Sequence, residues 1–150
     1  MKTRRFVLSK LILVLLLVGL FLLSGCATGP KFTKIDVIPE DKAVVYIYRP
    51  ASPIGAAVSY QVIANGTHIM PMVNGGYFVY YAKLGENEFS AATETLSSVT
   101  LDVKPGQNYY IKSSVGVGMF VGRPRFTIVP ADVGEKEIAD CKCQGERNKK

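Results

Sequence analysis

The sequence predicts an all-β domain, an antiparallel β-sandwich of about seven or eight short strands with a short C-terminal helix. From residue 43 onward, β-branched and aromatic residues recur with period two and not with the 3.6-residue period of a helix. Runs of this kind are separated by Gly, Pro and Asn at intervals of about 8 to 15 residues, which is typical of a sandwich. The length of 150 residues suits one such domain.

The first strand is apolar on both faces, which is expected of a central strand with cover on each side. Arg49-Pro50 ends it, because proline lacks the backbone donor that a ladder needs. Pro105-Gly106 suits the two central positions of a type II turn between two later strands. Strands are predicted at residues 43–48, 60–64, 67–70, 77–82, 87–93, 99–103, 109–112 and 125–129.

Asn65-Gly66 is the strongest hairpin signal in the chain, because a type I′ turn needs positive φ at both central residues. A two-residue loop places Val62 opposite Ile69, and Ile63 opposite His68. We expect Pro71 to end the second strand of this hairpin.

A helix is predicted at residues 132–141, near the end of the chain. Asp132 suits the N-cap, Glu135 follows three residues later as in a capping box, and Ile138 and Cys141 face the sheet. Gly134 opposes this prediction because glycine disfavours a helix interior. The folded domain is therefore assigned to residues 42–143, followed by a charged, frayed tail at 144–150.

The first 25 residues have the order of a signal peptide. Basic residues precede a thirteen-residue apolar run, 11–23, and the small residues Ser24 and Gly25 follow it. A helix needs about 18 to 20 apolar residues to cross a bilayer, so the run is too short for a permanent transmembrane helix.

The residues Leu23-Ser24-Gly25-Cys26 resemble the lipobox of bacterial lipoproteins. The resemblance implies that Cys26 is joined to a diacylglycerol, that the chain is cut between Gly25 and Cys26, and that residues 1–25 are removed. Ala27 occupies the position at which an aspartate resembles an inner-membrane retention signal. The expected location is the outer membrane, with the domain facing the periplasm, and residues 26–41 form the lipidated N-terminus and a tether.

The formal net charge of +6 belongs to the two ends of the chain. Residues 1–25 carry +4 and residues 146–150 carry +2, whereas residues 27–145 hold 11 bases and 11 acids. A neutral domain gives no reason to expect a nucleic-acid partner.

Several motifs of the predicted domain resemble a family of small bacterial lipoproteins with an uncharacterised domain. They are residues 42–50, Asn65-Gly66, residues 74–77, residues 105–111, and Glu137-Ile138 with Cys141. These motifs are turns and strands, so the resemblance implies the fold and the cell-envelope location and brings no reaction or cofactor with it.

Two groups of residues are candidates for chemistry. His68 is the only histidine and lacks a neighbouring nucleophile, which favours a surface residue over a catalytic one. Cys141 and Cys143 remain once Cys26 is lipidated. They form either a structural or idle pair, a strained and therefore redox-active disulfide, or two ligands of a metal site that lacks the usual four.

Other patterns have structural explanations that we favour. The glycines of residues 116–122 lack the Lys-Ser/Thr of a phosphate loop, so a flexible loop or bulge is expected. Arg123 and Arg125 form a weak anionic-lipid or polymer patch. The eight tyrosines suit strands, although a tyrosine cluster also stacks on sugars.

The sequence therefore favours a non-enzymatic envelope lipoprotein without catalytic, metal or cofactor residues. It would bind another envelope protein, a peptide or a glycan through an edge strand or an aromatic face. Two alternatives remain open: a thiol-active enzyme that uses Cys141 and Cys143, and an inhibitor of an envelope hydrolase that acts through residues 50–55 or 116–122.

Overall fold

The computed structural model describes residues 26–118 and 122–148, so the predicted signal peptide lies outside the described residues. Its helix is α2 (Ala131–Ile138). The strands are β1 (Lys42–Tyr48), β2 (Tyr60–Ala64), β3 (Thr67–Met72), β4 (Gly76–Lys83), β5 (Gly85–Ala92), β6 (Leu96–Val103), β7 (Asn108–Gly116), β8 (Arg123–Val129) and β9 (Lys142–Arg147).

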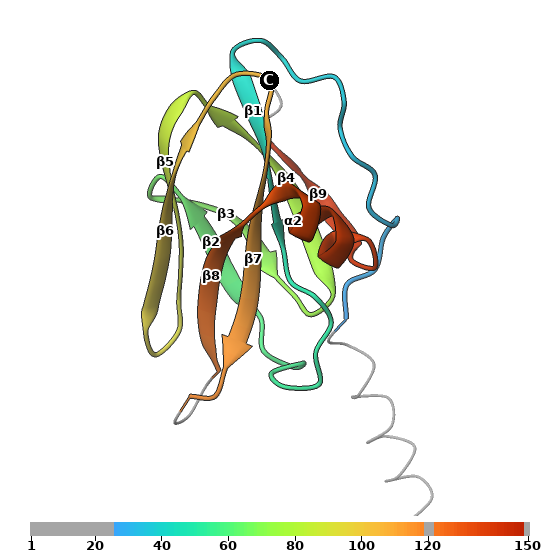
Figure 1. Ribbon diagram of the computed structural model, residues 1–150. Coiled ribbons are helices and arrows are strands. Elements are labelled where there is room, and N and C mark those ends of the chain that lie inside the picture. Colours follow the sequence, from blue (N-terminus) through green and yellow to red (C-terminus); the bar gives the residue numbers. More distant parts are fainter. Residues whose placement is uncertain (1–25, 119–121, 149–150) are drawn as a thin grey trace, which may run out of the picture.

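Two sheets pack face to face, which confirms the predicted sandwich and its C-terminal helix (Figure 1). One sheet has the order β8-β7-β1-β4-β9, and the other has the order β3-β2-β5-β6. The five-stranded sheet is mixed, because β1 pairs parallel with β7 and β4 pairs parallel with β9. All other strand pairs are antiparallel, as predicted.

The main core lies between the two sheets. It contains Val45 and Ile47 of β1 and Phe89 of β5, all fully buried. The alternate residues of β1, Val44 and Tyr46, are also fully buried, on the other face of the same sheet. The prediction of a central strand covered on both faces is therefore confirmed.

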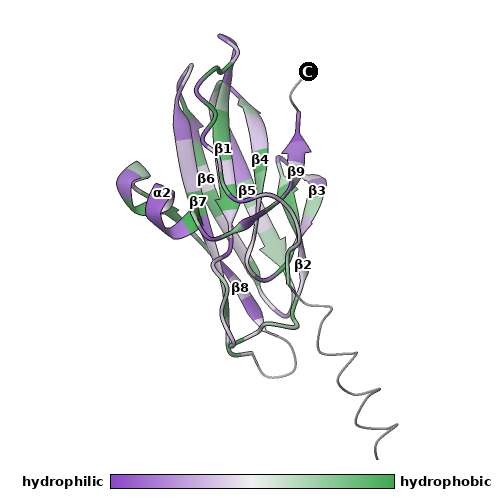
Figure 2. Cartoon of the chain, turned by 90° about the vertical axis from the view of Figure 1, so that its right-hand side faces the viewer, coloured by the Kyte–Doolittle hydropathy of each residue, from purple (hydrophilic) through white to green (hydrophobic). Residues whose placement is uncertain are grey.

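A second core lies on the outer face of the five-stranded sheet. Its centre is Tyr46, whose ring stacks on Tyr110 with centroids 5.1 Å apart. Helix α2 and residues 31–38 cover this face, and Ile138 of the helix is fully buried there. Figure 2 shows the hydrophilic surface of α2 turned away from the strands.

Residues 26–41 are more firmly placed than a tether. Phe32, Ile35 and Ile38 pack into the second core, and the Ile35 amide donates a 2.7 Å hydrogen bond to the Tyr46 hydroxyl. Figure 1 shows the segment running beside the five-stranded sheet to the start of β1. Apolar residues at every third position of this extended segment explain the contact.

The predicted hairpin forms, with Asn65 at φ 49° and Gly66 at φ 76°, as a type I′ turn requires. Ile63 lies opposite His68, as predicted. The pairing of Val62 with Ile69 was wrong, because the register shifts at this point and Val62 pairs with Met70. Pro71 lies inside β3, which tolerates it because β3 is an edge strand.

Two predictions for the C-terminal region were wrong. Helix α2 starts at Ala131 after Pro130, so Asp132 lies in its first turn and is not the N-cap residue, and the N-cap makes no side-chain hydrogen bond. Strand β9 covers residues 142–147, most of which were expected to form a frayed tail. The folded domain therefore extends beyond residue 143. Asp132 still suits the positive end of the helix dipole.

The sandwich has two ends. The Cys26 end contains Cys26 and the loops 49–59, 73–75 and 93–95, together with the described part of the β7–β8 loop. The opposite end contains the turns at 65–66, 84 and 104–107 and the end of β9 (Figure 1). Across residues 26–118 and 122–148, no helix has both the length and the apolar character needed to cross a bilayer.

Candidate functional site: a cationic pocket between two edge strands

The two sides of the sandwich are closed differently. On the β6–β8 side, the Phe126 amide donates to Ser97 Oγ at 3.2 Å, and Thr93 Oγ1 donates to the Gly122 carbonyl at 2.9 Å. On the β3–β9 side, long side chains bridge the gap between the sheets. Arg147 Nε donates to the Ile69 carbonyl at 3.1 Å, and Gln144 Nε2 donates to the Pro71 carbonyl at 2.9 Å.

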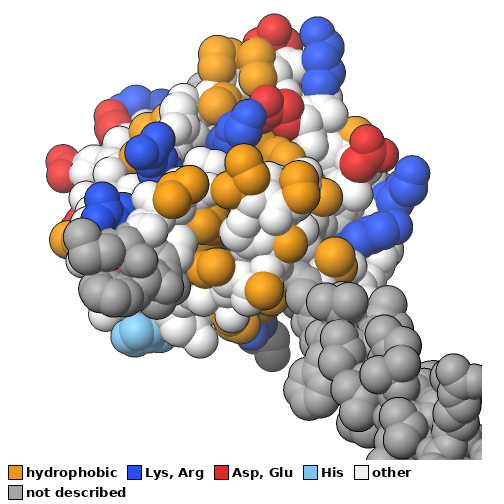
Figure 3. All heavy atoms as spheres, turned by 90° about the horizontal axis from the view of Figure 1, so that it is seen from below, with side chains coloured by type: hydrophobic (Ala, Val, Ile, Leu, Met, Phe, Trp, Pro, Cys, Tyr) orange, Lys and Arg blue, Asp and Glu red, His pale blue; other side chains and the backbone are white. Residues whose placement is uncertain are grey.

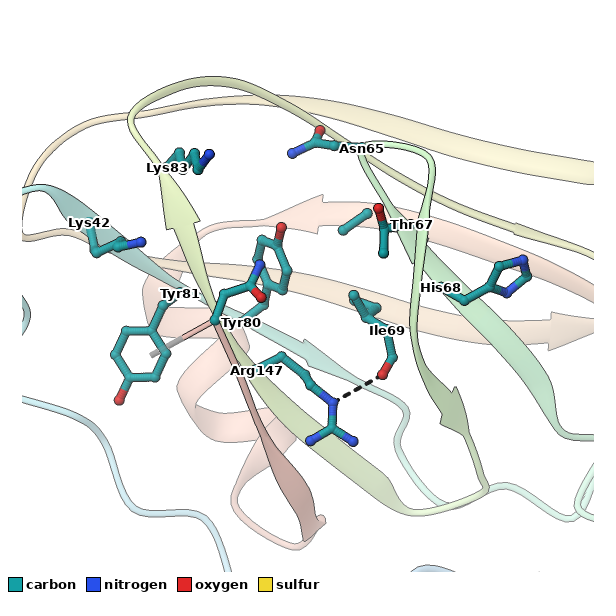
Figure 4. A pocket seen from close by; sticks show the side chains of 11 residues that line it. Lys42, Asn65, Thr67, His68, Ile69, Tyr80, Tyr81, Lys83 and Arg147 are labelled. Atoms are coloured by element: carbon teal, nitrogen blue, oxygen red, sulfur yellow. Dashed lines mark hydrogen bonds between the residues drawn. The ribbon is translucent and has the colours of Figure 1, made fainter. Parts of the chain in front are cut away.

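A pocket of about 490 Å³ opens on the β3–β9 side, toward the end that is opposite Cys26 (Figure 4). Ligand pockets commonly fall between about 300 and 1,000 Å³. Its lining includes three basic residues and no acidic one: Lys42, Ala64, Asn65, Thr67, His68, Ile69, Tyr80, Tyr81, Lys83, Arg147 and Asn148. The pocket is therefore suited to an anionic group.

Lys42 and Lys83 occupy directly paired positions of β1 and β4. Like charges at such positions destabilise a sheet. Neither lysine, nor Arg147, takes part in the salt bridges found among the described residues. None of these three charges is therefore neutralised by those salt bridges, although Arg147 Nε and Nη1 donate hydrogen bonds to the carbonyls of Ile69 and Glu146.

The rim of the pocket is held by asparagine hydrogen bonds. Asn65 Nδ2 donates to Asn87 Oδ1 at 3.0 Å, and Asn87 Nδ2 donates to the Lys83 carbonyl at 2.8 Å. Asn87 is only 2% exposed, so these bonds are shielded from water. They join the β2–β3 turn to the end of β4 and fix the backbone that carries Lys83.

His68 lies at the pocket's outer edge and is exposed. Its imidazole points away from Lys42 and Lys83 in Figure 4. The predicted surface position is confirmed. Among the described residues, no three His, Cys, Asp or Glu side chains are grouped so that they could hold a metal ion.

The two C-terminal cysteines lie in the second core as free thiols. Cys141 is 2% exposed, and its Sγ lies 3.6 Å from the Arg49 carbonyl oxygen. Burial and, to a lesser extent, the nearby Asp140 carboxylate raise the pKa of the Cys141 thiol to about 11. A thiol in this setting is a weak nucleophile, which favours the structural interpretation of the pair.

Cys26, the predicted lipidation site, is exposed. It forms a β-bridge with Asn74 in the β3–β4 turn, and the Ala27 amide donates to the Asn74 carbonyl at 2.9 Å. The predicted cleavage point between Gly25 and Cys26 lies at the boundary of the described residues. Cys26 is far from the pocket, at the other end of the sandwich.

The remaining candidates take structural positions. Seven of the eight tyrosines are buried, so they do not offer an open surface for stacking on sugars. The glycine-containing segment that begins at Gly116 joins β7 to β8, whereas a phosphate loop leads into a helix. Residues 119–121 of that segment lie outside the described residues.

The pocket lysines and Arg147 were not predicted as site residues. Lys42 and Lys83 flank two predicted strands, so antiparallel pairing of those strands would have brought them together. Arg147 could not be found in this way, because the sequence of β9, KCQGER, has no alternation of apolar and polar residues.

Comparison with known proteins shows that the central part of the chain matches a known protein family. Residues 39–123 match the family described as "Protein of unknown function (DUF2846)". The chain belongs to this family. The DUF2846 match covers β1 to β7 and contains Lys42, Lys83, Asn65 and His68 of the pocket, while α2 and β9 lie outside it.

A related chain of Haemophilus influenzae is described as "Uncharacterized protein". It is 30% identical over 127 residues, which cover 79% of this chain and 75% of that protein. No solved structure matches the chain. The DUF2846 assignment agrees with the expected uncharacterised family.

Proposed function

We propose that this chain is a lipid-anchored protein of the bacterial cell envelope that acts as a binding module and not as an enzyme. The signal-peptide order of residues 1–25 and the resemblance of residues 23–26 to a lipobox support the anchor on Cys26. The residue after Cys26 is alanine, which supports an outer-membrane location with the domain in the periplasm.

The binding site of this module is the pocket between β3 and β9. The observation that carries this proposal is the charge of the pocket lining. The lining contains Lys42, Lys83 and Arg147 and no acidic side chain. Its ligand is a small anionic group, a carboxylate or a phosphate, carried by a partner of the envelope. Asn65, Thr67 and Asn148 add amide and hydroxyl groups for hydrogen bonds to the same ligand.

The structure offers less support for the other two functions. A thiol-active enzyme would need a reactive thiolate, and Cys141 is buried with a raised pKa. An inhibitory loop would need to project into another protein's active site. Residues 50–58 are held down instead, because Arg49 Nη1 and Nη2 donate to the carbonyls of Val58 and Gly55, both at 2.6 Å.

Calorimetric titration of the mature, lipidated protein in detergent tests the pocket. The probes are inorganic phosphate, a short glutamate-rich peptide, and its glutamine-rich counterpart as the neutral control. We expect one anionic probe to bind and the neutral peptide to be silent. Which anionic probe binds distinguishes phosphate from carboxylate, and affinity falls as salt screens the lysines.

A matched pair of variants links any binding to the pocket. Lys42→Gln with Lys83→Gln removes two charges from the lining, whereas Arg125→Gln with Lys136→Gln removes two charges from exposed positions away from the pocket. We expect the first pair to weaken binding about tenfold, which corresponds to about 1.4 kcal/mol. Equal losses in the two double variants, or no binding of either anionic probe, would contradict the proposed site.

A further inference from the structure

The Cys26 end of the domain is a continuous surface built from several loops. Ser52 of the 49–59 loop donates its amide to Asn74 Oδ1 at 3.0 Å, next to the β-bridge of Cys26. In the same loop, Gly55 lies against the side chain of Val115 near the end of β7. The β7–β8 loop in turn contacts the β5–β6 turn, through the hydrogen bond from Thr93 to the Gly122 carbonyl.

This surface is poor in charge. Residues 50–59, 73–76 and 113–118 contain no charged side chain. Arg49 is buried beneath its own loop, and Glu94 forms a 3.5 Å ion pair with Arg123. By contrast, seven charged residues lie in or beside the turns of the opposite end: Glu40, Asp41, Lys42, Lys83, Glu86, Asp102 and Lys104.

Large hydrophobic side chains are exposed on or directly beside three of these loops. Ile54 is 61% exposed, Leu96 is 69% exposed and Val117 is 83% exposed. Figure 3 shows this end with hydrophobic side chains across its middle and charged ones toward its edge. Exposed apolar surface is unfavourable in water by about 25 cal/mol per Å², and a bilayer interface removes that cost.

The position of Cys26 supplies the occupant for this surface. Its backbone is fixed to Asn74, and the Cys143 amide donates to the Pro30 carbonyl at 2.8 Å, so no free linker separates Cys26 from the domain. Acyl chains on Cys26 would therefore bring this end, and not the charged end, to the membrane surface.

We propose that the Cys26 end of the domain lies against the bilayer that holds the acyl chains, with Ile54, Leu96 and Val117 in the interfacial region. This inference rests on the proposed lipidation of Cys26. The basic residues Lys142 and Arg125 lie near this end and suit anionic headgroups, whereas Lys31 forms a 3.8 Å ion pair with Asp140. The cationic pocket then opens at the end of the domain that points away from the membrane.

Because the chain contains no tryptophan, single tryptophan substitutions report on individual loops. Ile54→Trp, Leu96→Trp and Val117→Trp place the fluorophore on the proposed membrane face. Leu84→Trp is the control, since Leu84 is 44% exposed at the opposite end. Each variant is expressed with its signal peptide, and the processed protein is reconstituted into phosphatidylethanolamine and phosphatidylglycerol vesicles. The vesicle lipids carry bromine on the acyl chains near the headgroup, or no bromine.

We expect bromine to quench the tryptophan fluorescence of the three membrane-face variants and to leave the fluorescence of Leu84→Trp unchanged. The intact mass of each protein, measured before reconstitution, reports lipidation separately. A lipidated protein whose three loop tryptophans are quenched no more than Leu84→Trp would overturn the membrane face alone. A mature protein without acyl chains would overturn the proposed anchor, and the membrane face together with it.

Discussion

The hydroxyl of Tyr48 donates a 2.6 Å hydrogen bond to Glu137 Oε2 and so joins the central strand β1 to helix α2. The other carboxylate oxygen of Glu137 accepts a 2.6 Å hydrogen bond from Lys112 Nζ of β7. Three elements that are distant in sequence meet at one carboxylate, over the second core. The position of α2 on the sheet therefore depends on the ionisation of Glu137.

Stability should consequently fall at acidic pH through Glu137. The hydrogen bonds from Lys112 and Tyr48 lower the folded-state pKa of Glu137. A lowered carboxylate pKa stabilises the fold above the unfolded value of about 4.3 and loses this contribution as pH falls through the folded value. The free energy of unfolding, measured by urea denaturation, should fall between pH 7 and pH 3 by about 1 kcal/mol less in Glu137→Gln than in the parent. An unchanged difference would contradict this role.

Arg49 should be essential for the 49–59 loop. Replacing it by lysine removes the planar fork that serves two carbonyl oxygens, those of Gly55 and Val58, and leaves at least one of them unsatisfied. We expect Arg49→Lys to lower the free energy of unfolding by about 2 kcal/mol. Chemical denaturation measures this, and the exposed Arg125→Lys serves as control with a change within about 0.5 kcal/mol.

Gly134→Ala should destabilise the protein although alanine favours helices. A Cβ at position 134 would overlap the ring of Tyr110, so the helix would have to move off the sheet. We expect a loss of about 1–3 kcal/mol in place of the gain of about 1 kcal/mol at an exposed glycine. Lys136→Ala, on the exposed side of the same helix, should be close to neutral in thermal unfolding.

Cys141 should resist alkylation in the native protein. With a pKa of about 11, only about one Cys141 thiol in a thousand is ionised at pH 8, and the side chain is also buried. Mass spectrometry after iodoacetamide treatment should show Cys141 unmodified until denaturant is added. Rapid labelling of Cys141 under native conditions would revive the thiol-active interpretation.

Cys26→Ser should abolish the anchor. Serine offers no thiol for the diacylglycerol, so we expect Cys26→Ser to incorporate no labelled fatty acid and to accumulate as unprocessed precursor. The parent protein, expressed in the same cells, should be labelled and cleaved. A Cys143→Ser variant should be labelled like the parent. Normal cleavage of Cys26→Ser before residue 26 would show that the chain carries an ordinary secretory signal.

The sequence was informative where local chemistry decides the structure. The alternation of apolar residues predicted eight strands, and Asn65-Gly66 predicted the hairpin, because period-two patterns and positive-φ turns are written in neighbouring residues. Even the cover on both faces of β1 followed from its uninterrupted apolar run.

Features that depend on distant partners were missed. Strand β9 has no strand-like pattern and owes its conformation to pairing with β4, and to the bonds of Gln144 and Arg147 to β3. In the sequence, Gly134 opposed the helix prediction. The structure explains the glycine, because the ring of Tyr110 leaves no room for a Cβ at this position. The pocket escaped notice for the same cause, because its charges meet only once β1, β4 and β9 lie side by side.

The cover of the second core also determines when the protein can finish folding. The tyrosine-rich face of β1, β4 and β7 is covered by residues 31–38 and by residues 131–143, which stand near the two ends of the chain. Because residues 131–143 follow β1, β4 and β7 in the chain, this face lacks half of its cover until those residues are in place. A nascent chain that stalls after β8 would thus expose Tyr48 and Tyr110 to neighbouring molecules, and a quality-control factor could recognise it by that surface.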